Sequence, residues 1–222
     1  MEYELHEFNQ GKAAISSNLE LTKLWEEILD SITSISEEEI INYFQTQKRK
    51  AKSISEAINN ILDKKLVDKG WDRQSPIYKD AELSDKTWTL DFAKGLEGKD
   101  GKKAGIPIEV VFNHGEAIAW NLIKLSLASE NNVQKKFQFN PSVGVYICAT
   151  KDLKDKGGFD GAIGEYEKVL KYLEPLDQKM IKPILVIGLK APHSFRIERY
   201  PQNHINQKLR NRSSGKLIKI NH

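Results

Sequence analysis

Two stretches near the middle of the chain alternate between apolar and polar residues. In residues 87–92 the apolar positions share one face and Asp91 lies on the other, and in residues 106–113 the same holds for Glu109. A period of two is typical of half-buried strands. The residues between them are rich in glycine and lysine, which favours a turn. The alternation therefore predicts a β-hairpin within residues 87–116 that brings Asp91 and Glu109 onto the same polar face. The apolar positions are Trp88, Leu90, Phe92, Ile106, Ile108, Val110 and Phe112.

Apolar residues recur at spacings of three and four in other segments, a pattern that predicts amphipathic helices. These segments are residues 19–35, 53–67 and 162–173. Ser36, which is followed by three glutamates, predicts the N-cap of a further helix. Gly70 predicts a left-handed C-cap. Residues 116–130 form a helix that is apolar on more than one stripe, so it is either buried in the domain or shared with a second copy.

Two near-continuous apolar runs, residues 143–149 and 184–189, predict central strands covered on both faces. Residues 1–15 are consistent with a first edge strand, and residues 71–85 with an irregular connector. We expect an α/β fold with a mixed central β-sheet of about five or six strands flanked by helices, and with the hairpin at one edge. One domain spans residues 1–222, of which 199–222 form a basic C-terminal segment.

Composition narrows the possible functions only slightly. The net charge of +3 does not by itself indicate a polyanionic partner. The single cysteine, Cys148, excludes an intramolecular disulfide and a cysteine-based metal cluster, and its apolar neighbours predict a buried strand residue. No apolar run is long enough to span a membrane, and the N-terminus lacks the pattern of a signal peptide. We therefore expect a cytoplasmic protein.

The predicted proximity of Asp91 and Glu109 has a chemical consequence. Two carboxylates at the end of a hairpin repel each other unless a cation lies between them. Mg²⁺ accepts one or two carboxylates together with water and substrate phosphates, and such a site supports phosphodiester hydrolysis. The alternative is a structural hairpin, in which Asp91 pairs with a loop lysine and Glu109 faces water.

The same segment resembles a known family. An Asp followed eighteen residues later by the Glu of an Ile-Glu-Val-Val run is similar to the PD-(D/E)XK nuclease pattern. The segment IEVVF resembles a strand of the BglII and BstYI group of type II restriction endonucleases. Further segments that resemble this group follow in the same order, and they are LWEEILDSITSI, KGW, GVYICATKDL and PILVIGL.

The resemblance implies a fold and an activity. It implies a restriction-endonuclease-like sheet and a Mg²⁺-dependent enzyme that cuts double-stranded DNA as a homodimer at a short palindromic site, with GATC at its centre. Asp91 and Glu109 would hold the metal and act in catalysis. A companion DNA methyltransferase is implied as well, without being a bound partner.

One position departs from the family pattern. The second residue after the Glu is usually Lys, Glu or Gln, whereas here it is Val111, which has no polar group to position or activate water. Either another group substitutes for it or the chain is catalytically impaired. Asn113 and Glu116 follow closely, and we expect one of them to be the substitute.

Several residues are candidates for DNA binding. Asn113 and His114 lie just after the second strand of the hairpin, where His114 has either a structural role or a contact with DNA. Two basic segments are either solvated and structural or contact phosphates and bases. Their candidate residues are Lys48, Arg49, Lys50, Lys52, Arg210 and Arg212.

Two other functions fit the sequence. The chain could be a DNA-binding relative inactivated at Val111, or a protein-interaction domain that docks a partner through the helix at residues 116–130. Cleavage of plasmid DNA that EDTA abolishes separates the enzyme from the first alternative. Salt-sensitive DNA binding separates it from the second.

Overall fold

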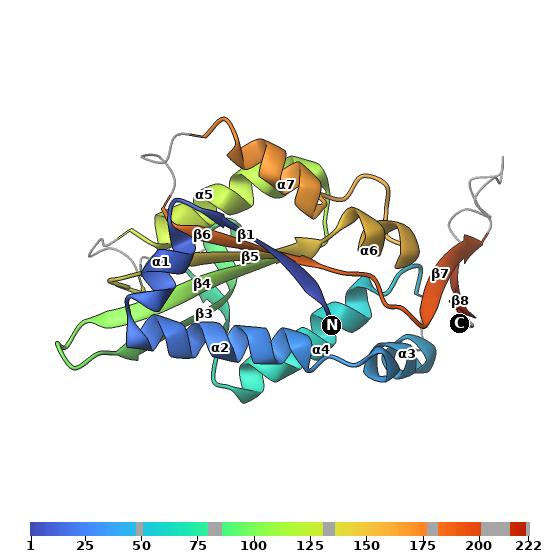
Figure 1. Cartoon of the computed structure of the whole chain (residues 1–222), viewed down its shortest axis with the longest axis horizontal. Coiled ribbons are helices and arrows are strands. Elements are labelled where there is room, and N and C mark those ends of the chain that lie inside the picture. Colours follow the sequence, from blue (N-terminus) through green and yellow to red (C-terminus); the bar gives the residue numbers. More distant parts are fainter. Residues whose placement is uncertain (48–50, 80–85, 131–135, 177–181, 201–213, 221–222) are drawn as a thin grey trace.

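The computed structural model describes residues 1–47, 51–79, 86–130, 136–176, 182–200 and 214–220. It contains a six-stranded mixed sheet with helices on both faces, which confirms the expected fold class (Figure 1). The strand order is β1-β6-β5-β4-β3-β2, in which β4, β5 and β6 are parallel and their other neighbours are antiparallel. The strands are β1 (Tyr3–Phe8), β2 (Asp72–Pro76), β3 (Thr89–Glu97), β4 (Lys103–Val111), β5 (Gly144–Ala149) and β6 (Ile184–Leu189).

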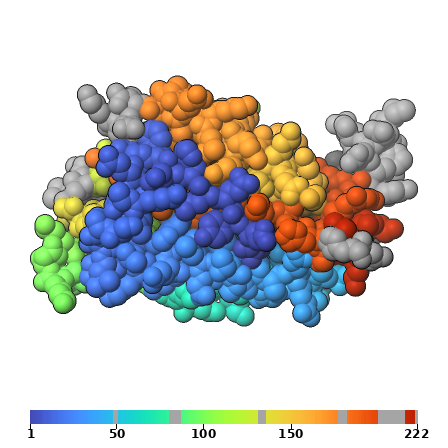
Figure 2. Space-filling model, in the orientation of Figure 1, coloured from blue at the N-terminus to red at the C-terminus, as the bar shows by residue number. Residues whose placement is uncertain are grey.

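Two apolar clusters hold the helices against the sheet. Leu24 and Ile28 belong to the cluster under α2 and α4, while Leu122 and Leu125 belong to the cluster under α5 and α7. These helix pairs lie on opposite sides of the sheet (Figure 1). The side chains of β1, α1 and α2, in blue, form much of the surface in the view of Figure 2. The helices are α1 (Gly11–Ser16), α2 (Leu19–Thr33), α3 (Glu37–Thr46), α4 (Ser55–Asp68), α5 (Ile118–Ala128), α6 (Lys151–Lys156) and α7 (Tyr166–Leu173), with 3-10 turns η1 (Lys86–Trp88) and η2 (Gly115–Ala117).

Local sequence signals explain where several elements begin and end. Ser36 and Glu39 form a reciprocal capping box at the start of α3, as the run of glutamates predicted. Gly70 has a φ of 79°, which confirms the predicted left-handed residue after α4. Strands β5 and β6 are buried along their whole length, and Cys148 is buried within β5. None of the helices in the described segments has the length and apolarity needed to cross a membrane.

The predicted hairpin is present as β3 and β4, but three expectations about it were wrong. It does not lie at the edge of the sheet, because β4 is central and β2 lies outside β3. The stretch at residues 71–85 contains β2, whose polar sequence does not alternate. Leu90 and Phe92 were expected on one face, but they pack in different apolar clusters. The first residues of β3 pair with β2 alone, and pairing with β4 begins only at Phe92.

A second, two-stranded sheet consists of β7 (Phe195–Tyr200) and β8 (Ser214–Lys219). Part of the segment at residues 199–222 is therefore folded. The Gly215 N–H donates to the Ala51 carbonyl at 2.8 Å, and Arg199 Nε donates to the Gly158 carbonyl at 2.6 Å. These bonds fasten the hairpin to residues that precede α4 and follow α6.

The Phe139 ring lies against the hairpin at a point where two glycines face each other. Gly95 and Gly105 are cross-strand partners in β3 and β4, and a Cβ atom built on either would collide with this ring. Phe139 is almost completely buried. The close approach of an aromatic ring therefore requires glycine at both positions.

We predict that Gly105→Ala destabilises the fold by about 1–3 kcal/mol, because the new methyl group must displace the buried ring. Denaturant unfolding measures the change. Gly161→Ala is the matched control, since its Cβ would meet no atom within 4 Å. Equal stability of the two variants would contradict the assigned packing.

Candidate active site

Asp91 and Glu109 meet at the point where β3 and β4 separate. The last register pair between these strands is Phe92 with Ile108, and the two acids are the next residue on each strand. The Val110 N–H donates to Asp91 Oδ2 at 2.8 Å, so the carboxylate replaces a strand carbonyl as the acceptor. The hairpin thus brings the two acids to this point from adjoining strands. They do not share one polar face as the alternation predicted, because Asp91 lines a hollow beside α4 whereas Glu109 lies under α5.

The environment of Glu109 differs from the expected polar surface. Glu109 is only 3% exposed, because α5 covers this face of β4. Lys124 of α5 places its Nζ 2.7 Å from Glu109 Oε1, and the same Nζ donates to the Thr89 carbonyl at 3.0 Å. The alternative of a solvated Glu109 is therefore wrong, and the cation that pairs with it comes from a helix rather than from the hairpin loop.

Burial perturbs both carboxyl groups. It raises the pKa of Asp91, and the Val110 N–H and Lys124 oppose this rise. For Glu109, burial and then the charge of Asp91 raise the pKa to about 8, although Lys124 opposes them. The protein thus holds two like charges close together and neutralises them only in part, an arrangement found where a cation or a proton takes part in function.

A small hollow adjoins Asp91. It has a volume of about 180 Å³ and lies between β3, β4 and α4. Its polar lining includes Asn59, Asp63 and Gln74, and Asp63 forms an ion pair with Arg73 at 2.7 Å. Asp91 therefore faces a polar hollow on the side of the sheet opposite α5.

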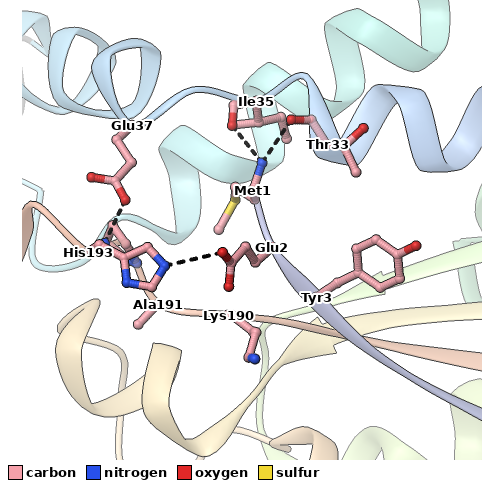
Figure 3. A pocket seen from close by; sticks show the side chains of 10 residues that line it. Met1, Glu2, Tyr3, Thr33, Ile35, Glu37, Lys190, Ala191 and His193 are labelled. Carbon is pink, nitrogen blue, oxygen red and sulfur yellow. Dashed lines mark hydrogen bonds and ion pairs between the residues drawn. The ribbon is translucent and has the colours of Figure 1, made fainter.

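A larger hollow of about 560 Å³ lies near the start of β1 (Figure 3). Its polar groups already pair with one another. His193 Nε2 lies 3.4 Å from Glu2 Oε1, the His193 N–H donates to Glu37, and the Met1 ammonium donates to the Ile35 carbonyl at 2.6 Å. We place the active site at the separation of β3 and β4, where Asp91, which lines the smaller hollow, and the buried Glu109 meet.

The loop after β4 is fixed from both sides. The Gly115 N–H donates to the Ala162 carbonyl at 2.8 Å, and the Gly164 N–H donates to the Asn113 carbonyl at 3.0 Å. The side chains of Asn113, His114 and Glu116 are exposed. Neither Asn113 nor Glu116 has a hydrogen bond or ion pair to Asp91 or Glu109 in the described part of the chain, so their catalytic role stays a prediction.

Most of the predicted basic contacts cannot be placed. Lys48, Arg49, Lys50, Arg210 and Arg212 lie outside the described residues. Lys52 is described and exposed, next to Ala51 at the attachment of β8. Lys52 therefore lies at the β7–β8 end of the molecule.

Comparison with known proteins decides the family. The model of the family described as restriction endonuclease BglII/BglIII matches residues 3–189. The chain belongs to the BglII/BglIII restriction endonuclease family. The matched residues include Asp91, Glu109 and Lys124, and they end before the β7–β8 hairpin.

One solved structure of a restriction endonuclease agrees with the fold, and a second is similar at a lower level. The crystal structure of restriction endonuclease BglII complexed with a DNA 16-mer is 18% identical, has a TM-score of 0.60, and covers 99% of this chain and 100% of its own. The crystal structure of free BglII is 11% identical with a TM-score of 0.42, at the same coverage. No curated protein matches the sequence.

The acids fit a divalent metal by their chemistry. Asp91 and Glu109 are oxygen donors held close together, and Mg²⁺ commonly takes two carboxylates and completes its shell with water and phosphate. Within the described residues no group of three or more His, Cys, Asp or Glu gathers into a metal site. In this restriction endonuclease the two acids would therefore hold the metal jointly with substrate oxygens.

Lys124 is the residue of this site that the sequence analysis did not single out. It is the charged residue of the mostly apolar helix α5 and is only 8% exposed. A lysine buried in this way requires a partner, so its isolation in an apolar helix was a usable signal. Its partner depends on the packing of α5 against β4, which the sequence pattern does not specify.

We predict that metal-free Glu109→Gln becomes more stable than the parent chain as pH rises from 5 to 8. The unfolded glutamate loses its proton near its ordinary pKa of 4.5, whereas the folded one keeps it to about pH 8. The parent chain therefore loses stability across this range, and the glutamine variant lacks that loss. Urea unfolding in EDTA at several pH values measures the difference, and a gap independent of pH would contradict the raised pKa.

Proposed function

We propose that the protein is a Mg²⁺-dependent type II restriction endonuclease that hydrolyses phosphodiesters of double-stranded DNA at a short palindromic site. The observation that supports this most strongly is the pairing of half-buried Asp91 with buried Glu109 in a chain of the BglII/BglIII family. The resemblance to the BglII and BstYI group makes a GATC-containing site the leading choice. The DNA 16-mer in the BglII structure supports duplex DNA as the substrate.

The roles of the residues follow from their positions. Asp91, oriented by the Val110 N–H, and Glu109 would hold Mg²⁺ at the separation of β3 and β4. When bound, the ion polarises the scissile phosphate and promotes ionisation of the attacking water. The water oxygen attacks phosphorus in line, and the bond to the 3′ oxygen breaks. The products are a 5′-phosphate and a 3′-hydroxyl, which takes its proton from solvent.

DNA would lie across the edge where the parallel strands end. The loop with Asn113 and His114 leaves β4 at this edge, and β7 follows β6 after five residues. The β7–β8 end contributes the exposed side chains of Lys52, Lys216 and Lys219. Exposed cations on one side of the acids suit the phosphate backbone of a duplex.

We also propose a homodimer, because a two-fold symmetric protein matches a palindromic site. Helix α5 is the proposed shared element, since Trp120 and Ile123 remain partly exposed on it. A companion DNA methyltransferase would protect host DNA, and the enzyme would act in the cytoplasm. The alternative is a DNA-binding relative without activity. Val111 favours it, because this residue is buried and apolar.

We predict that Asp91→Ala lowers the cleavage rate by more than about 100-fold, because loss of even an outer-shell residue of a metal site costs 10- to 100-fold. Plasmid DNA is incubated with Mg²⁺, and the ends of the fragments are sequenced to give the site. EDTA should abolish cleavage by the parent chain. Fragments formed equally by Asp91→Ala would overturn the assignment of the site, and absence of cleavage by the parent would favour the inactive relative.

We predict that Lys52→Gln and Lys216→Gln each reduce the slope of log affinity against log salt by about 1, since each removes one phosphate contact. Fluorescence anisotropy with a labelled duplex of the cleaved sequence, without divalent metal, measures the slope. Lys12→Gln is the control, because this exposed lysine lies on α1 at the opposite end of the molecule (Figure 1). A slope unchanged by the first two variants would place DNA elsewhere.

A further inference from the structure

The side chain of Val111 is buried in the apolar core. It is 2% exposed and packs in the cluster that contains Ile118 and Leu122. It follows Glu109 by two residues in the same strand, so its side chain points to the same face, under α5. The position that carries a polar group in the resembled pattern thus serves only to attach α5 to the sheet.

The same helix supplies a cation to this face. Lys124 Nζ contacts Glu109 of β4 at 2.7 Å and the Thr89 carbonyl of β3 at 3.0 Å. Thr89 precedes Asp91 by two residues. Lys124 therefore links both strands that carry the acids, and its ammonium is held at the point where they separate.

Stability does not account for this lysine. Replacing a buried ion pair by apolar residues of similar size is often neutral or stabilising, because desolvation offsets the attraction. The apolar cluster under α5 contains Leu122 and Leu125, and apolar residues at both Glu109 and Lys124 would extend it. The presence of lysine here therefore indicates a role in the reaction.

Polar groups accompany Lys124 on this face. Tyr146 of β5 is the register partner of Glu109, and its hydroxyl is fully buried without a well-directed hydrogen bond in the described part of the chain. Asn121, one turn before Lys124 in α5, lies beside that hydroxyl and is also buried. Glu109 Oε1 likewise has no hydrogen bond of good geometry, although it pairs with Lys124. The site thus retains unused hydrogen-bonding capacity next to the acids.

We propose that Lys124 is the catalytic cation of this enzyme and takes the role that Val111 has lost. When DNA binds, its ammonium contacts the attacking water and the scissile phosphate, orienting the first and stabilising the negative charge that develops on the second. The bond from water oxygen to phosphorus forms as the bond to the 3′ oxygen breaks. The proton of the water passes to solvent, and the lysine keeps its own protons. This inference rests on the proposed nuclease function.

Lys124→Met tests the inference, because methionine keeps the length and packing of the side chain without its charge. Single-turnover cleavage of a duplex with the sequenced site should fall by roughly 100-fold or more. DNA affinity without metal should stay within about threefold of the parent, because the change acts on the transition state. The Mg²⁺-dependent rise in melting temperature should persist, since Asp91 and Glu109 remain.

Lys94→Met is the matched control. Lys94 makes a comparable ion pair on the opposite face of the sheet, 2.8 Å from Glu27 Oε2, and it also donates to the Lys69 carbonyl. Its loss should lower the melting temperature and leave the cleavage rate of the folded protein unchanged. Cleavage by Lys124→Met within about threefold of the parent, or an equal loss in Lys94→Met, would overturn the inference.

Relocating the cation gives a second readout. In the double variant Val111→Lys, Lys124→Met the lysine returns to the strand, and cleavage should recover by about tenfold or more over Lys124→Met. A purely structural role of Lys124 predicts no recovery, since the second change adds a charge to the core. If the parent chain cleaves no DNA, the proposed function fails. If the parent and Lys124→Met cleave at rates within about threefold of each other, this inference alone fails.

Discussion

The confinement of two like charges at the separation of β3 and β4 is the constraint on which the site depends. Burial raises the pKa of both Asp91 and Glu109, and the charge of Asp91 further disfavours ionisation of Glu109. The fold compensates with one backbone N–H on Asp91 and one ammonium on Glu109. These contacts do not fully neutralise the two carboxylates, so the site favours binding of a cation, which can in turn bind a phosphate.

The rest of the domain packs on both faces of the hairpin. On one face α5 packs over β4 and β5 and delivers Lys124. On the other, Glu27 of α2 accepts from Lys94 of β3 and from the Trp71 indole, which fastens α2 to the hairpin and to the start of β2. Because Lys124 contacts both strands that bear the acids, the point where they separate is held without depending on the loop between the strands.

Regular patterns in the sequence predicted the fold well, and tertiary packing accounts for most of what they missed. The hairpin, the two buried parallel strands and the capped helix at Ser36 follow from local periodicity and local hydrogen bonding. The sequence of β2 was unreadable because Asp72–Pro76 is polar and its Gln74 has a φ of 50°, so neither alternation nor propensity marks it as a strand. It becomes a strand only by pairing with β3.

The site was predicted in part for the same reason. Asp91 and Glu109 were accessible to sequence analysis because one hairpin carries both. Lys124 was not, since its position depends on how a helix packs. The proposed substitutes Asn113 and Glu116 were chosen for closeness in sequence, whereas the partner of Glu109 in the structure lies fifteen residues further on. Short sequence separation identified the strand partners but not the residue supplied from another layer.

The paired loops at residues 113–115 and 162–164 have a consequence for the evolution of sequence preference. Asn113 and His114 lie between β4, which carries Glu109, and α5, which carries Lys124. Backbone hydrogen bonds at Asn113 and Gly115 restrict the movement of this loop. If this loop contacts bases, as proposed, a substitution that moves it toward a different base also shifts α5. New specificities in this lineage would therefore arise together with adjustments of turnover, and directed-evolution libraries should vary the loop and the first turn of α5 jointly.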